Sequence, residues 1–139
     1  MSANSKIIPV VLAGGQGLRL WPLSNETTPK QFLNLGSQTT LFQQALIRCT
    51  GPMFDATPIV ITAQKCRGHV LQAAEELNQD VDIILEPLSR NSCAAMVAGA
   101  LRAIETNPSA ILLVLAADHD IPDVDIFQAS VLKALPAAQ

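Results

Sequence analysis

The residues best suited to chemistry follow apolar runs along the chain, and the first group is rich in glycine. Gly14, Gly15 and Gly17 come directly after the apolar run 7–13, and Arg19 follows them. Glycines after a strand let the backbone approach a ligand and point N–H groups at it, a geometry that suits phosphate oxygens. Three glycines within four residues, followed by an arginine, therefore indicate a phosphate-binding loop rather than a plain tight turn.

This loop does not match two common phosphate-binding motifs. The P-loop needs a Lys-Ser or Lys-Thr pair after its last glycine, and none follows here. In the dinucleotide fingerprint Gly15 and Gly17 would be the first two glycines, but Leu20 holds the third position. Thr62 and Ala63 stand where that fingerprint expects an acidic residue. A flavin or nicotinamide oxidoreductase is therefore disfavoured.

A second group lies between an apolar run and a predicted helix. Its members follow the run 81–85 and are Glu86, Pro87, Arg90, Asn91 and Ser92. Asn91 or Ser92 would cap a helix whose first turn contains no Asp or Glu. A helix start without an acid is open to an external anion or to the polar edge of a base.

A third group follows the apolar run 110–116. Asp118 comes just after it, and a carboxylate at the end of an interior strand is a natural ligand for Mg²⁺. We expect His119 to point to the opposite side of the strand because side chains alternate along a strand. Asp120 is expected at the surface. His69 is expected to be solvated, on a helix far from these loops.

These groups need a scaffold, and the sequence predicts an α/β fold for it. Strands are predicted at 7–13, 58–62, 81–85 and 110–116, and helices at 40–48, 65–78, 91–106 and about 123–135. Strands that alternate with helices indicate a Rossmann-like, mostly parallel sheet with helices on both faces. Ligands bind beyond the carboxyl ends of the strands in such sheets, which is where the three groups fall. Residues 14–38 are predicted to form a long loop of the kind that is often functional.

Composition restricts the class of protein. A length of 139 residues fits one domain, and 49 % apolar residues favour a buried core over disorder. The net charge of −3 argues against a nucleic-acid partner. No apolar run reaches the roughly 20 residues needed to span a bilayer, so no membrane partner is expected. The cysteines are expected to be buried free thiols in a cytoplasmic protein, since no two form a C-x-x-C pair: Cys49, Cys66 and Cys93.

The glycine-rich loop and its continuation resemble the mannose-1-phosphate guanylyltransferases. Residues 14–33 contain G-G-x-G-x-R-L-W-P-L-S and then P-K-Q-F-L, which is similar to the signature of that family. Trp21, Pro22 and the tail Gln31-Phe32-Leu33 point to the mannose branch rather than to an enzyme for another sugar such as glucose. Two further stretches resemble family motifs, I-L-E-P-L-S-R-N-S at 84–92 and L-A-A-D-H at 115–119.

The resemblance implies a nucleotide-diphospho-sugar transferase fold and a nucleotidyl transfer. The substrates would be GTP and α-D-mannose 1-phosphate, the products GDP-mannose and pyrophosphate, and the cofactor Mg²⁺. Arg19 and Lys30 would face the phosphates, and Asp118 would hold the metal. The implied nucleotide site comprises Leu12, Ala13, Gly14, Gly15, Gly17, Arg19, Glu86, Pro87, Arg90, Asn91 and Ser92.

The resemblance covers the chain from about Ile7 onward, whereas family members continue further. Residues 1–139 are therefore expected to be the nucleotide-binding half without the sugar-binding half. The alternative is a non-catalytic GTP- or GDP-binding module or an inactive fragment. Leu18, Asn25 and Cys93 depart from the family pattern. In the family's sheet the fourth strand lies beside the first, so its apolar edge would be bare, and we expect a homo-oligomer through that edge.

Overall fold

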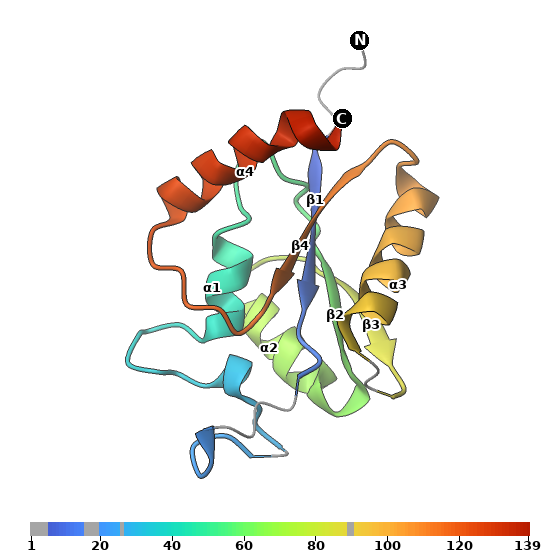
Figure 1. Ribbon diagram of the computed structural model, residues 1–139. Coiled ribbons are helices and arrows are strands. Elements are labelled where there is room, and N and C mark those ends of the chain that lie inside the picture. The colour runs from blue at the N-terminus through green and yellow to red at the C-terminus, as the bar shows by residue number, and fades with distance from the viewer. Residues whose placement is uncertain (1–5, 16–19, 26, 89–90) are drawn as a thin grey trace.

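The protein has a four-stranded parallel sheet with helices on both faces (Figure 1). The computed structural model describes residues 6–15, 20–25, 27–88 and 91–139. The strands are β1 (Ile7–Leu12), β2 (Ile59–Ala63), β3 (Asp82–Glu86) and β4 (Ile111–Ala116), in the order β3-β2-β1-β4. The predicted strands and the predicted place of the fourth strand beside the first are therefore confirmed.

The four predicted helices are confirmed as well. They are α1 (Leu41–Ile47), α2 (Arg67–Glu76), α3 (Asn91–Thr106) and α4 (Val124–Ala138), and two short 3-10 helices are η2 (Lys30–Phe32) and η3 (Gln64–Cys66). A capping box begins α1, because the Thr40 hydroxyl accepts from the Gln43 amide at 3.2 Å and the Gln43 side chain accepts from the Thr40 amide at 2.9 Å. The Asp123 carboxylate accepts from the Ile126 amide and caps α4.

The core has two faces because side chains alternate along the strands. On one face Ile8 and Val10 of β1 pack with Ile59 and Ile61 of β2 beneath α3. On the other face Val11 and residues of α1 and α2 form a second cluster, and α4 packs beside it against β1 and β4. In Figure 1 α3 lies to the right of the sheet, and α1 and α2 lie to its left. The layers are thus helix, sheet, helix.

Helix α3 approaches the sheet closely through a glycine. A Cβ added at Gly99 would lie 2.7 Å from Val10 Cγ1 and 3.2 Å from Ile61 Cδ1. These distances are shorter than the roughly 3.5–4 Å at which carbon atoms pack. Any larger side chain would therefore push α3 away from β1 and β2.

The two edge strands of the sheet are less buried than the two central strands. Strands β3 and β4 are half-buried over their whole length, because each pairs with a neighbour on one side within the described residues. Helix α3 also exposes an apolar row on its outer face, with Val97, Leu101 and Ile104.

The cysteines are free, but the prediction that all three are buried is wrong for one of them. Cys49 and Cys66 are buried, whereas Cys93 is exposed in the first turn of α3. Burial raises the pKa of the Cys49 thiol to about 12 and also raises the pKa of Cys66.

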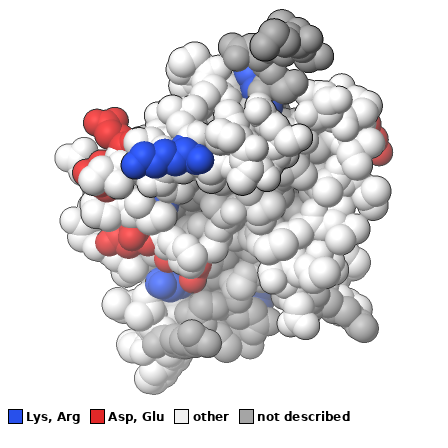
Figure 2. All heavy atoms as spheres, turned by 45° about the horizontal axis from the view of Figure 1, so that its top comes forward, with Lys and Arg blue, Asp and Glu red and all other residues white. Residues whose placement is uncertain are grey.

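Two surface properties bear on partners. Among the described residues, no helix combines the length and the apolar character needed to cross a bilayer. On the face drawn in Figure 2, acidic and basic side chains are scattered over a mostly uncharged surface, and the described residues there form no continuous basic patch.

Candidate active site

The carboxyl ends of the parallel strands lie at one end of the sheet, and the described candidate residues gather there. Ala13, Gly14 and Gly15 follow β1, Glu86 ends β3, and Asp118 follows β4. The register brings these ends level, since Leu12 pairs with Ile61 on one side and with Ala116 on the other. This is the edge at which ligands bind in open α/β sheets.

The start of the glycine-rich loop is fixed by hydrogen bonds to its backbone. The Ala13 amide donates to the Ile61 carbonyl at 2.8 Å, which continues the sheet by one residue. The Ala13 carbonyl accepts from Thr62 Oγ1 and from Gln31 Nε2, both at 3.0 Å. Gln31 Nε2 also donates to the Gly15 carbonyl at 3.1 Å. The segment 29–33 thus holds the loop although the two lie far apart in sequence.

Glu86 reaches from the end of β3 to Gly14. A Cβ added at Gly14 would lie only 2.6 Å from Glu86 Oε2. Glycine is therefore needed at this position for the carboxylate to lie where it does. The contact brings two of the predicted nucleotide-binding residues together across the end of β2.

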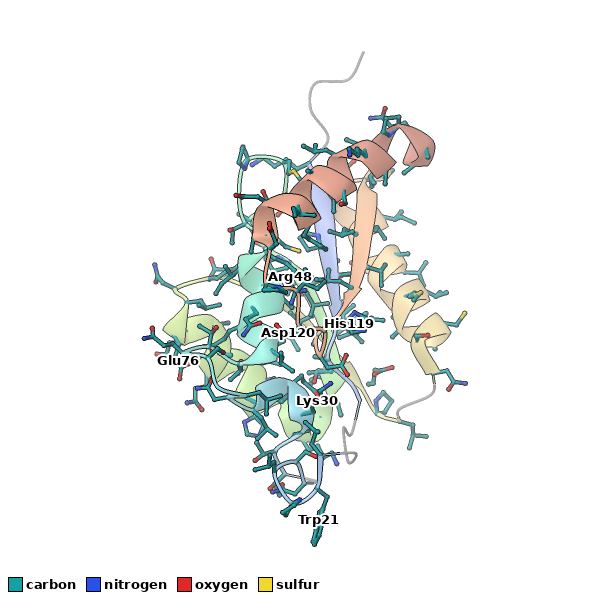
Figure 3. The ribbon with its side chains drawn as sticks, turned by 60° about the vertical axis from the view of Figure 1, so that its left-hand side comes forward. Trp21, Lys30, Arg48, Glu76, His119 and Asp120 are labelled. Atoms are coloured by element: carbon teal, nitrogen blue, oxygen red, sulfur yellow. The ribbon has the colours of Figure 1, made fainter. Side chains whose placement is uncertain are left out.

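Lys30 and Asp118 form an ion pair beside a cavity. Lys30 Nζ lies 3.8 Å from Asp118 Oδ2, and their side chains are 31 % and 47 % exposed. The cavity has a volume of about 280 Å³, and its lining is mostly polar, including Lys30, Asp118, Asp120, Ser37, Thr39 and Gln44. Figure 3 shows Lys30 from the η2 segment close to Asp120 and His119. Two of the three predicted catalytic residues are therefore neighbours with access to solvent.

His119 does not take the side of the strand that was predicted. Its Nε2 lies 4.0 Å from Asp118 Oδ1, and its ring is exposed. The alternation of side chains fails here because β4 ends at Ala116 and residues 117–118 form a turn. Asp120 is exposed, as predicted.

Arg48 supports the loop that carries Asp118. The side chain is 1 % exposed, and its Nη2 donates to the His119 carbonyl at 2.8 Å while its Nε donates to the Gln44 carbonyl at 3.2 Å. Its Cζ lies 5.8 Å from the centre of the Phe127 ring. Burial lowers the pKa of Arg48, and the charge of Asp120 acts in the opposite direction. Sequence reasoning missed this residue, since its partner carbonyl lies 71 residues away.

The prediction that His69 lies far from the loops is wrong. Its Nε2 lies 2.7 Å from the Thr27 carbonyl, and its ring stacks on Phe32 with centres 5.1 Å apart. Helix α2 therefore contacts the long loop just before the Lys30 segment. The sequence pattern placed His69 on the correct helix but could not show which way the helix faces.

Of the remaining predicted site residues, four are described by the structure and three are not. Leu12 is half-buried, and Pro87, Asn91 and Ser92 are exposed. Asn91 begins α3 with a φ of 57°, a left-handed conformation that asparagine tolerates, and the first turn of α3 contains no acid, as predicted. Three predicted residues lie outside the described residues, namely Gly17, Arg19 and Arg90.

Comparison with known proteins gives a consistent result. Residues 8–138 match the model of the nucleotidyl transferase family. The chain is 44 % identical over 140 residues to a mannose-1-phosphate guanylyltransferase of Escherichia coli (strain K12), covering 99 % of this chain and 29 % of that protein. It is 41 % identical over 139 residues to the xanthan biosynthesis protein XanB of Xanthomonas campestris pv. campestris (strain B100), covering 97 % of this chain and 29 % of that protein.

A solved structure supports the same fold. A crystal structure from Thermus thermophilus, described as a mannose-1-phosphate geranyltransferase, superposes with a TM-score of 0.82 and 32 % sequence identity. The match covers 96 % of this chain and 38 % of that chain. The chain thus spans less than a third of the length of the curated relatives named above.

Proposed function

The chain belongs to the nucleotidyl transferase family, and on that premise we propose that it forms the nucleotide-binding half of a mannose-1-phosphate guanylyltransferase. The proposed reaction transfers a nucleotidyl group from GTP to α-D-mannose 1-phosphate and gives GDP-mannose and pyrophosphate. The choice of guanine and mannose is supported by the curated relatives, since the one from E. coli carries that name.

One observation carries this proposal: a lysine and an aspartate meet at the carboxyl end of the sheet, next to the glycine-rich loop. Lys30 Nζ and Asp118 Oδ2 lie 3.8 Å apart, and both side chains are accessible to a ligand. An isolated surface ion pair contributes little to stability, so its position over the strand ends favours a role in binding. A site that binds a triphosphate needs positive charge, which a lysine and a metal ion held by a carboxylate would provide.

The reaction would be an in-line displacement at phosphorus. An oxygen of the sugar phosphate attacks the α-phosphorus of GTP and forms a new P–O bond, while the bond to the β-phosphate bridging oxygen breaks and pyrophosphate leaves. No protein nucleophile is needed. The task of the protein is to hold two polyanions together and to offset their repulsion.

The described residues fit separate parts of that task. Lys30 provides a point charge for the phosphates, and the backbone amides at Gly14 and Gly15 provide neutral donors. Glu86 and the start of α3 at Asn91 lie on the side of β3, where they can contact the nucleoside. We propose the same phosphate-binding role for Arg19 as its position in the sequence pattern predicts.

The donor set suits Mg²⁺ as a cofactor. Mg²⁺ keeps several waters and is usually bound through one or two carboxylates together with substrate phosphates. Asp118 offers one accessible carboxylate beside Lys30, and Asp120 lines the same cavity. When bound, Mg²⁺ would neutralise charge on the phosphates.

A turnover assay tests the proposal in a protein extended to the length of the relatives. Pyrophosphate release from GTP and mannose 1-phosphate should exceed release with ATP or with glucose 1-phosphate. Lys30→Met should lower kcat by about 10²-fold, as expected for loss of one charge contact to the transition state. The matched control Lys65→Met, at an exposed position in η3, should leave the rate unchanged. Equal rates for Lys30→Met and the control would overturn the role of Lys30.

We also propose that the chain associates with a second copy through β4. The strand lies at the edge of the sheet in the described residues, is apolar along its length and is half-buried. Unpaired backbone groups on an apolar edge favour pairing with another strand. Sedimentation at tens of micromolar should show a dimer or larger species, and a clean monomer would contradict this proposal.

A further inference from the structure

Gln31 has a buried side chain to which the proposed mechanism assigns no role. It is 3 % exposed and lies in η2 between Lys30, which contacts Asp118, and Phe32, which packs in the core. Its Nε2 donates to the carbonyls of Ala13 and Gly15 at 3.0 and 3.1 Å. A side-chain amide nitrogen has two protons, so both are used on the glycine-rich loop.

The direction of these bonds determines what the loop presents to a ligand. The Ala13 carbonyl accepts from both Gln31 and Thr62 and is therefore turned toward the interior. In a trans peptide the N–H of the next residue points opposite to the carbonyl. The N–H of Gly14 is thus directed outward, toward the side at which a phosphate would bind.

The flexibility of glycine makes this restraint of the two carbonyls necessary. A glycine peptide can rotate more freely than any other, so an unrestrained loop would also present carbonyl oxygens outward. Those oxygens carry partial negative charge and would repel a phosphate. A donor that holds two carbonyls inward removes this alternative and lowers the entropy lost on binding.

From this geometry we propose that Gln31 is a positioning residue that orients the Gly14–Gly15 backbone for the nucleotide phosphates. The inference rests on the proposed function and adds a residue to it. Gln31 does not contact the substrate. It acts through the backbone of the loop, while the neighbouring Lys30 acts directly.

The chain offers a matched control for the loss of a buried glutamine. Gln43 is 5 % exposed, and its Nε2 donates to Glu76 Oε2 at 2.7 Å, between α1 and α2. Its removal leaves Glu76 with a second donor, because Gln72 Nε2 contacts Glu76 Oε1 at 3.0 Å. Gln43→Met therefore deletes a comparable buried amide, and with it the Gln43 half of the α1 capping box, without changing the glycine-rich loop.

The experiment is a calorimetric titration of GTP with Mg²⁺ into wild type, Gln31→Met and Gln43→Met, with thermal unfolding of each variant as a check of the fold. Gln31→Met should raise the Kd about tenfold, because the Gly15 carbonyl loses the donation from Gln31 and the Ala13 carbonyl keeps only that from Thr62. Gln43→Met should stay within about twofold of wild type. A folded Gln31→Met variant that binds GTP like the control overturns the inference.

A second variant distinguishes donation from packing. Gln31→Glu keeps the shape of the side chain but sets a carboxylate against two carbonyl oxygens, so GTP binding at pH 8 should be weaker than in Gln31→Met. At pH 5.5 the introduced carboxyl can hold a proton and donate one hydrogen bond, so its Kd relative to wild type should improve, whereas that of Gln31→Met should not. The same ratio at both pH values overturns the inference. A wild-type chain that binds no nucleotide overturns the proposed function as well.

Discussion

Replacement of Gly99 by alanine tests how closely α3 packs on the sheet. The new Cβ would lie 2.7 Å from Val10 Cγ1, about 1 Å inside normal carbon contact. Val10 is fully buried in β1, and because protein cores are close-packed its side chain has little room to turn. Helix α3 must therefore move outward, and its first residue, Asn91, moves with it.

Two effects of opposite sign set the size of the change. Overpacking a well-packed core costs about 1–3 kcal/mol. Alanine in place of glycine inside a helix contributes about 0.5–1 kcal/mol of stability. Gly99→Ala should therefore lower the free energy of unfolding by about 0–2.5 kcal/mol, because the packing cost equals or exceeds the helix gain.

The same substitution in α2 should have the opposite sign. Gly68 is exposed, and no heavy atom lies within 4 Å of a Cβ added there. Gly68→Ala should raise the free energy of unfolding by up to about 0.5 kcal/mol, since only helix propensity changes in this first turn. Urea unfolding followed by circular dichroism gives both values. If Gly99→Ala stabilises the chain as much as Gly68→Ala does, α3 does not approach β1 as described.

Three further predictions concern the site and its support. Gly14→Ala should weaken GTP binding about tenfold, because the new Cβ displaces the Glu86 carboxylate. In a Glu86→Ala background, calorimetry should show little further loss of GTP binding from Gly14→Ala. Additive losses would mean that the two residues act separately. Arg48→Lys should lower the free energy of unfolding by about 1–2 kcal/mol in urea, because an ammonium cannot bridge the two carbonyls that the guanidinium holds. Arg67→Lys on the exposed face of α2 should leave the unfolding midpoint unchanged. Burial raises the pKa of Cys49 from 9.0 to about 12, so the free energy of unfolding should fall as pH rises from 9 toward 12. The slope of this pH dependence should be smaller in Cys49→Ala. An equal slope in both proteins would exclude Cys49 as its source.

Much of the fold could be predicted from the sequence because its elements are locally encoded. The β-branched run at 7–13 and the apolar run at 110–116 became β1 and β4, and the Thr40 cap fixed the start of α1. The position of strand four beside strand one came from family resemblance, not from periodicity. The bare edge of β4 was expected from the same resemblance. The half-exposure of β3 was not predicted, since a run of apolar residues does not show how many neighbours a strand has.

The positions of the described candidate residues were predictable, but their contacts were not. The glycines and Asp118 could be placed at the strand ends because loops after parallel strands meet at one edge. The roles of Gln31 and Arg48 depend on carbonyls that lie 18 and 71 residues away, and no local pattern reports such pairings. The contact of His69 with Thr27 could not be predicted for the same reason.

The most direct test of the proposed nucleotide site is a calorimetric titration of GTP and ATP into the chain with Mg²⁺ present. Asp118→Ala removes the carboxylate beside Lys30, and Asp80→Ala removes an exposed carboxylate before β3 as a control. We predict that GTP binds more tightly than ATP, that Asp118→Ala abolishes this binding and that Asp80→Ala retains it. Binding of GTP that survives Asp118→Ala unchanged, or no preference between the two nucleotides, would contradict the proposed site.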